Sequence, residues 1–143
     1  MSGGTMQDVQ HISDRLDVLL EAEPFANDRR LAARLCLAFC DRLLPAMDGD
    51  LLTALAVGRD FWAGKVGERQ RLGALGLLSP RLNRYVPKSA QDGINRLVFG
   101  ALTDTEGLTW QKGQFLVEMA GYAGLSTDEI ENIFAEHLPG FRD

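Results

Sequence analysis

Cysteine and histidine are scarce in this chain, which has two of each among its 143 residues. A structural zinc site needs four ligands, mainly of these two types. Cys36 and Cys40 lie four positions apart, so one helical face could hold both thiols, but His11 and His137 stand near opposite ends of the chain. We therefore expect no metal site and interpret both cysteines as core residues, with a redox pair or a pair of metal ligands as alternatives.

Long apolar runs are also missing, and no segment approaches the roughly 18 residues that a membrane-spanning helix requires. The first ten residues lack the basic and then apolar pattern of a secretory signal. Two cysteines without such a signal fit a reducing compartment, so we expect a cytoplasmic protein without a membrane partner. The hydrophobic fraction of 45% and the charged fraction of 24% predict one globular domain over residues 1–143, with a disordered tail at residues 1–7.

The sequence contains none of the common catalytic signatures. It has no phosphate-binding loop that ends in Lys-Ser or Lys-Thr, no dinucleotide fingerprint, no HExxH and no nucleophile elbow. His137 has carboxylates nearby in the sequence, as a general base can have, but the same neighbourhood fits the solvated face of a helix. We predict a non-catalytic protein without a cofactor, and an enzyme with unrecognised chemistry is the alternative.

No window shows the alternation of polar and apolar residues that marks a strand. Apolar residues instead recur every three or four positions, and proline and glycine divide this pattern into segments. The sequence predicts an all-α bundle of about seven helices, arranged as antiparallel hairpins. We expect helices at about residues 8–20, 28–44, 51–63, 68–78, 90–102, 110–124 and from 127 onward.

Two of these helices differ in the strength of their signals. The last helix has the clearest start, because Ser126 and Glu129 match the capping box. The helix at residues 68–78 is the weakest, since Gly73 and Gly76 each destabilise a helix interior. Its expected core residues are Leu72, Leu75 and Leu78.

Charge of one sign is nearly missing from three segments of the chain. Residues 1–28 hold six acids and one base, and residues 104–143 hold eight acids and two bases. Residues 65–88 hold one acid, Glu68, and six bases: Lys65, Arg69, Arg71, Arg81, Arg84 and Lys88. We interpret these blocks as solvated helix faces, with a polarised surface that steers a charged partner as the alternative. The net charge of −5 disfavours nucleic-acid binding through the whole surface.

Two parts of the chain resemble known families. Residues 40–45, Cys-Asp-Arg-Leu-Leu-Pro, end one helix, and residues 54–64 form an Ala-rich helix that ends in Arg, an aromatic pair and Trp-x-Gly. These pieces, within residues 32–75, resemble small all-helical immunity proteins of bacterial polymorphic toxin systems. Residues 104–134 resemble the helical hairpins of tellurite-resistance-type domains, although residues 109–112 lack the acid expected there. The first resemblance implies a cytosolic protein that neutralises a cognate toxin.

Candidate partner-binding residues follow from two arguments. Arginine and tryptophan are enriched in binding hot spots, which points to Arg59 and Trp62, with a conformational clamp and domain-edge packing as their alternative roles. If the toxin is a nuclease, an acidic face would complement its basic cleft. The acidic candidates are Asp14, Asp17, Glu129, Glu131 and Glu136. A helical adaptor of another partner, compatible with a homodimer, and a nucleic-acid-binding protein that uses the basic segment are the alternative functions.

Overall fold

The computed structural model describes residues 6–22, 29–103, 108 and 110–141. Seven α-helices lie in these ranges: α1 (Met6–Ala22), α2 (Arg29–Asp41), α3 (Gly49–Trp62), α4 (Glu68–Leu78), α5 (Ala90–Leu102), α6 (Trp110–Tyr122) and α7 (Thr127–His137). Two short 3-10 segments, η2 (Leu44–Ala46) and η3 (Ser79–Asn83), follow α2 and α4. The described residues contain no strand, so the predicted all-α bundle of seven helices is confirmed.

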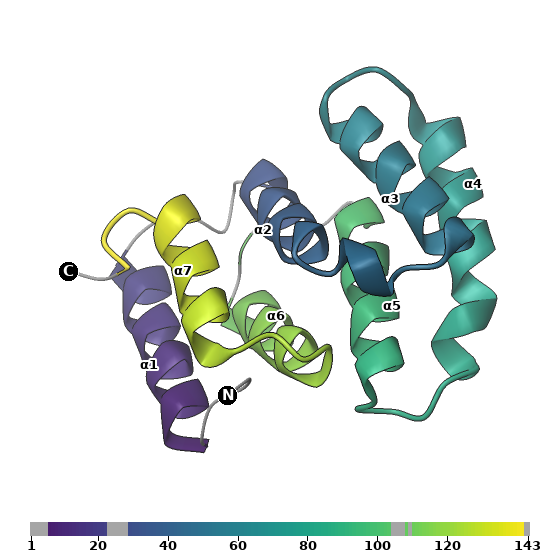
Figure 1. The fold of residues 1–143 in the computed structure, drawn as a ribbon. Coiled ribbons are helices and arrows are strands. Elements are labelled where there is room, and N and C mark those ends of the chain that lie inside the picture. The colour runs from purple at the N-terminus through teal and green to yellow at the C-terminus, as the bar shows by residue number, and fades with distance from the viewer. Residues whose placement is uncertain (1–5, 23–28, 104–107, 109, 142–143) are drawn as a thin grey trace.

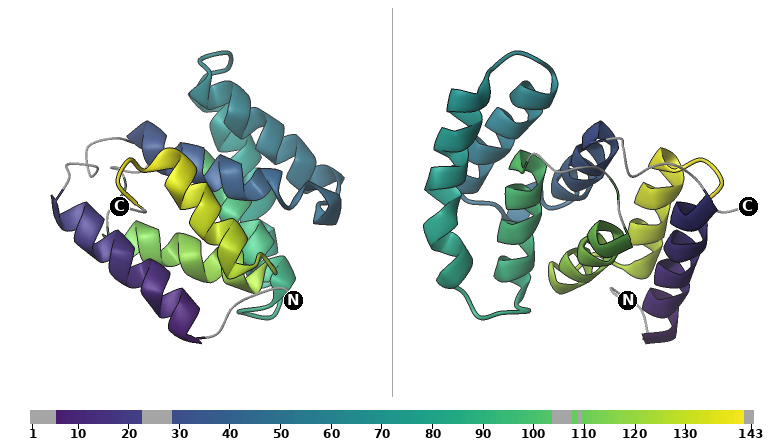
Figure 2. Two further views of the ribbon diagram at one scale, coloured as in Figure 1. Left: turned by 60° about the vertical axis from the view of Figure 1, so that its left-hand side comes forward. Right: turned by 180° about the vertical axis from the view of Figure 1, so that it is seen from behind.

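Helix α5 occupies the middle of the bundle and packs against α2, α3, α4 and α6. The antiparallel hairpin of α3 and α4 forms one end of the molecule, and α1, α6 and α7 form the other (Figure 1). Helix α2 lies between these two ends and contacts α3 as well as α7. The view from behind places α4 and α1 at opposite outer edges (Figure 2). A surface that faces both α3 and α7 can therefore form along α2.

The core is mainly aliphatic and has an aromatic cluster between α2 and α7. Phe39 meets Phe134 edge-on with 5.4 Å between the ring centres, and Phe134 stacks on Phe141 at 5.6 Å. Phe39 and Phe134 are both fully buried. Edge-on and offset aromatic pairs stabilise beyond their buried area, so this cluster fixes how α7 lies on α2.

Two glycines of α5 allow its neighbours to come close. A Cβ atom at Gly93 would lie 2.6 Å from the carbonyl oxygen of Met119 in α6. A Cβ atom at Gly100 would lie 3.1 Å from the Sγ atom of Cys36 in α2. No real Cβ atom approaches a backbone oxygen so closely, so glycine at position 93 sets the distance between α5 and α6.

The helix ends agree with local sequence signals in most places. The Ser126 hydroxyl accepts the Glu129 N–H at 3.2 Å and the Glu129 carboxylate accepts the Ser126 N–H at 3.1 Å, which confirms the capping box. The expected end of α2 at Leu44 is wrong, because the helix ends at Asp41. Proline disfavours helical geometry in the residue before it, and Leu44 precedes Pro45. The chain there tightens into η2.

Three other expectations concern helix starts or the tail. Helix α1 begins at Met6, so residues 6 and 7 of the expected tail belong to it. The rest of that tail, residues 1–5, lies outside the described residues. The helix start expected at residue 28 also lies outside them, whereas the start expected at residue 110 is confirmed, because α6 begins at Trp110.

The expected core of α4 is only partly correct. Leu78 is buried and Leu75 is half-buried, but Leu72 is 55% exposed. Two residues outside the expected core, Arg71 and Ala74, are buried. Positions 71, 74, 75 and 78 share one side of a helix, so the side of α4 that faces α3 and α5 begins at an arginine rather than at Leu72.

Candidate functional site: a groove between α2, α3 and α7

A groove of about 440 Å³ lies where α2, α3 and α7 meet. Its apolar residues are Leu37 and Ala38 of α2 and Ile133 of α7, which are half-buried or buried. Its polar residues are Arg34, Asp41, Arg42, Arg59, Glu136 and His137. The groove thus combines an apolar floor with a charged rim, the anatomy of many protein interfaces.

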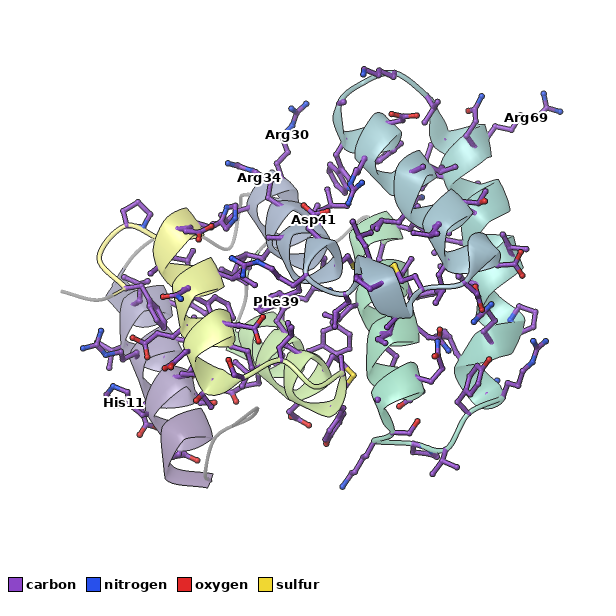
Figure 3. The ribbon with its side chains drawn as sticks, in the orientation of Figure 1. His11, Arg30, Arg34, Phe39, Asp41 and Arg69 are labelled. Carbon is purple, nitrogen blue, oxygen red and sulfur yellow. The ribbon has the colours of Figure 1, made fainter. Side chains whose placement is uncertain are left out.

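Helix α2 supplies most of the groove because its sequence is amphipathic. Leu35 and Phe39 point into the core, whereas Arg34 and Asp41 are exposed on another side. Figure 3 shows Arg34 and Asp41 along the same side of α2, with Arg30 extending beyond them. The spacing of three and four residues that buries one face of α2 therefore also aligns the charged residues of the rim.

Two ion pairs cross the groove and join α2 to its neighbours. The Arg59 guanidinium of α3 donates to the Asp41 carboxylate of α2. Arg42, the residue after α2, and Glu136 of α7 approach to 3.9 Å. All four side chains are more than 40% exposed. Such pairs contribute only about 0–1 kcal/mol each, so the rim can exchange these partners for those of a ligand at little loss of stability.

The rim has more cations than anions. Three guanidinium groups line it, from Arg34, Arg42 and Arg59, against the two carboxylates of Asp41 and Glu136. A guanidinium group has five N–H donors and can hold a carboxylate through two of them, even when another donor is in use. The groove is therefore suited to an anionic group that lies beside an apolar one.

The structure brings together two of the predicted partner-binding residues, Arg59 and Glu136. Trp62 is half-buried, and its indole N–H donates to the Ala101 carbonyl oxygen at 2.8 Å, which fixes the end of α3 on α5. Glu129 is part of the α7 cap. Arg59 and Glu136 therefore lie in the groove, whereas Trp62 and Glu129 hold helix positions.

The other acidic candidates lie elsewhere. Asp17 is half-buried and accepts a hydrogen bond of 3.4 Å from Gln114 of α6, and Glu131 is half-buried on α7. Asp14 is exposed in a second groove of about 300 Å³ between α1 and the C-terminal segment. In that groove the Arg15 guanidinium donates to the Phe141 carbonyl oxygen at 2.5 Å. The five acidic candidates are thus distributed over different surroundings.

Four polar residues of the groove are not among the predicted site residues: Arg34, Asp41, Arg42 and His137. His137 was expected on a solvated face, but it is half-buried and lines the groove. The signal for Arg34 and Asp41 is their spacing, since seven positions are about two helical turns and place both on the exposed side of α2. No such signal links α2 to α7, because that contact joins segments about one hundred residues apart.

Two bases of the segment 65–88 are not part of a solvated face. Arg71 donates to the Leu102 carbonyl oxygen at 2.8 Å and to the Glu68 carboxylate, and Arg81 binds the Asp48 carboxylate at 2.7 Å. Both arginines are buried. The hydrogen bond from Arg81 lowers the pKa of Asp48, and the same bond raises the pKa of Arg81. The expected basic face is therefore reduced to its four exposed members, Lys65, Arg69, Arg84 and Lys88.

The two thiols are core residues, as predicted. Cys36 and Cys40 are free and fully buried, and burial raises the pKa of both thiols. Thiolate chemistry is disfavoured for such groups. Within the described residues, no three His, Cys, Asp or Glu side chains gather in a way that could hold a metal ion.

The described helices include none that is both long enough and apolar enough to span a bilayer. No protein-family model matches the chain, and neither the curated proteins nor the solved structures contain a significant match to it.

Proposed function

We propose that this chain is a non-catalytic protein-binding module, and that its partner binds in the groove between α2, α3 and α7. The observation that carries the proposal is the charged rim around an apolar floor, built from three helices that the core holds in place. Fully desolvated apolar anchors surrounded by a polar rim supply most of the energy in protein interfaces. The groove offers such an anchor site on Leu37 and Ala38, which are half-buried.

The partner that fits this site presents an acidic side chain next to an apolar one. The acidic group would replace Asp41 on Arg59 or Glu136 on Arg42, because these exposed pairs are weak. The apolar group would fill the floor. Electrostatic complementarity of this kind raises the association rate and the specificity of an interface.

A bacterial toxin is the partner class that the sequence resemblance favours. The resembling residues 32–75 include most of α2 and all of α3, which together form two of the three sides of the groove. The proposed role is neutralisation of that toxin by direct binding. The burial of Arg71 and Arg81 weakens the alternative of nucleic-acid binding through the basic segment.

Co-expression in bacteria with the product of the neighbouring gene tests the proposal. Viable cells are counted for the wild-type chain, for Arg59→Glu in the groove and for Arg84→Glu as a control with the same change of charge outside it. We expect the wild type and the control to protect equally and Arg59→Glu to lose most of the protection. Cells that die equally with and without the wild-type chain would refute the toxin proposal, and equal protection by Arg59→Glu would place the binding site elsewhere.

A further inference from the structure

Helix α4 has an apolar outer face that nothing in the described chain covers. Leu72 and Leu77 are 55% and 41% exposed on this face, and Gly73 and Gly76 lie between them. Figures 1 and 2 show α4 at an outer edge of the molecule. The face points away from α3 and α5, and it lies apart from the groove proposed above.

The two glycines of this face differ from four other glycines inside helices and resemble Gly121 of α6, where a Cβ atom also meets no described atom. A Cβ atom at Gly58, Gly93, Gly100 or Gly113 would lie within 2.6–3.5 Å of an atom from another helix. A Cβ atom at Gly73 or Gly76 would have no atom of the described chain within 4 Å. Glycine destabilises a helix interior relative to alanine, and here no contact within the chain compensates for it. An approaching helix from outside would use the space that these glycines leave.

The face is symmetric about its own centre. At about 100° per residue, Gly73 and Gly76 lie about 60° apart around the helix and Leu72 and Leu77 about 140° apart, and both pairs are centred on the same direction. The sequence Leu-Gly-Ala-Leu-Gly-Leu at 72–77 therefore presents the same exposed residues in either direction. Suppose that a two-fold axis lies outside this face, at the level of the peptide bond between Ala74 and Leu75. Leu72 would then lie level with Leu77 of a second copy, and Gly73 level with Gly76. At a two-fold interface, residue i of one copy contacts residue j of the other and the reverse contact is repeated, so here leucine would meet leucine and glycine would meet glycine.

The charge near the start of α4 favours the same antiparallel arrangement. Arg69 is exposed and extends away from the molecule (Figure 3). Antiparallel packing places the two Arg69 side chains at opposite ends of the contact, whereas parallel packing would bring them together.

We infer that the outer face of α4 is a self-association site, where a second copy of this chain packs antiparallel about a two-fold axis. The glycines allow the two helices to approach closely, and the exposed leucines of each copy cover the other helix. A stable interface buries about 800 Å² on each partner, which is more than one short helix offers. The dimer is therefore weak and forms only at high protein concentration.

Sedimentation equilibrium of the purified chain from about 10 µM to 1 mM tests the inference in this concentration range. We expect the mean mass to rise from 15.7 kDa toward twice that value. The double variant Gly73→Gln and Gly76→Gln should weaken association at least tenfold while its thermal midpoint stays the same or rises, because glutamine favours a helix. Gly121→Gln in α6, where a Cβ atom also meets no described atom, is the matched control and should associate like the wild type.

Disulfide trapping tests the two-fold geometry independently. Gly73→Cys and Gly76→Cys chains, mixed in equal amounts and mildly oxidised, should form more than twice as much mixed disulfide as either homodimer, which is the ratio that random pairing gives, while Gly121→Cys forms few disulfides. Cys36 and Cys40 do not interfere because they are fully buried. A wild-type chain that stays monomeric at 1 mM would refute the inference, as would equal association of the glutamine variant or equal trapping at position 121. Neither result bears on the groove, since none of these positions lines it.

Discussion

Helices α5 and α4 are neighbours that use glycine in opposite ways. Helix α5 lies in the middle of the bundle, where Gly93 and Gly100 give α6 and α2 room to pack against it. Helix α4 lies at the edge, where Gly73 and Gly76 face open space. The same residue type therefore fixes a contact in one helix and leaves a surface uncovered in the other. Contacts within one chain therefore account for the glycines of α5, whereas no contact within the described chain accounts for those of α4.

The inner face of α4 behaves like α5. Arg71 on that face is buried and binds the Leu102 carbonyl oxygen at the end of α5. Its guanidinium carbon also lies 5.5 Å from the centre of the Phe61 ring. The contrast is thus between helix faces that pack inside the molecule and the exposed outer face of α4. Single substitutions on each face can test it.

The largest effect is expected at Gly93. The Gly93→Ala substitution would place a Cβ atom 2.6 Å from the Met119 carbonyl oxygen, so α5 and α6 would have to move apart. We expect a loss of about 3 kcal/mol in the free energy of unfolding, measured by urea denaturation. Gly121→Ala is the control, since it has no described neighbour within 4 Å and should not destabilise. If Gly93→Ala is as stable as the wild type, α5 and α6 leave room for a Cβ atom at position 93.

The next largest effect is expected at Arg71. The Arg71→Met substitution keeps an unbranched side chain but leaves the Leu102 carbonyl oxygen and the Glu68 carboxylate without their donor. We expect a loss of about 2 kcal/mol in the free energy of unfolding. Arg69→Met, on the exposed face of the same helix, should change stability by less than about 0.5 kcal/mol. Equal effects of the two substitutions would remove the distinction between the inner and outer faces of α4.

A smaller, pH-dependent effect is expected at Asp48, which caps α3 and binds Arg81. Asp48→Asn retains the cap and removes the charge. Because Asp48 is half exposed, we expect a loss of about 1 kcal/mol at pH 7. The pKa of Asp48 is lower in the folded state than its usual value of 3.8, so its contribution is complete above that value and disappears as the pH falls through the folded pKa. Unfolding measured from pH 7 to pH 2.5 should show the two proteins converging in acid, and a constant difference would contradict the ion pair.

The smallest effect is expected at Gly76, and it has the opposite sign to the effect at Gly93. Gly76→Ala should raise the free energy of unfolding by about 0.5–1 kcal/mol in dilute solution, because alanine favours a helix and its Cβ atom meets no described neighbour. Thermal unfolding at low micromolar concentration measures this gain without a contribution from the proposed dimer. A loss of stability would show that this face of α4 is covered within the monomer.

Local signals in the sequence were sufficient for the fold and for several details. The Ser126 cap and the burial of both cysteines follow from neighbouring residues and from residue type, and the structure agrees with both. The predicted end of α2 at Leu44 lies three residues beyond the observed end at Asp41, because the chain next to Pro45 forms the 3-10 segment η2 instead of continuing the α-helix. Errors of this kind shift a boundary but do not change the fold.

The candidate site was much less predictable than the fold. Arg59 and Glu136 were singled out for different reasons, yet they line the same groove. The sequence does not point to His137 or Arg42, because their surroundings depend on how α7 packs on α2. The basic segment shows the same limit, since Arg71 and Arg81 become buried only when α5 and the start of α3 supply their partners.

The sequence by itself determined the helices, because apolar spacing, caps and prolines act between residues that are a few positions apart. It also determined that the thiols are core residues. On the outer face of α4, it determined that the order leucine, glycine, glycine, leucine is the same from either end. Only the tertiary structure decided which charges meet across α2, α3 and α7, which arginines are buried and which glycines have neighbours. Those features depend on contacts between segments that are distant in the chain, and helical periodicity carries no information about them.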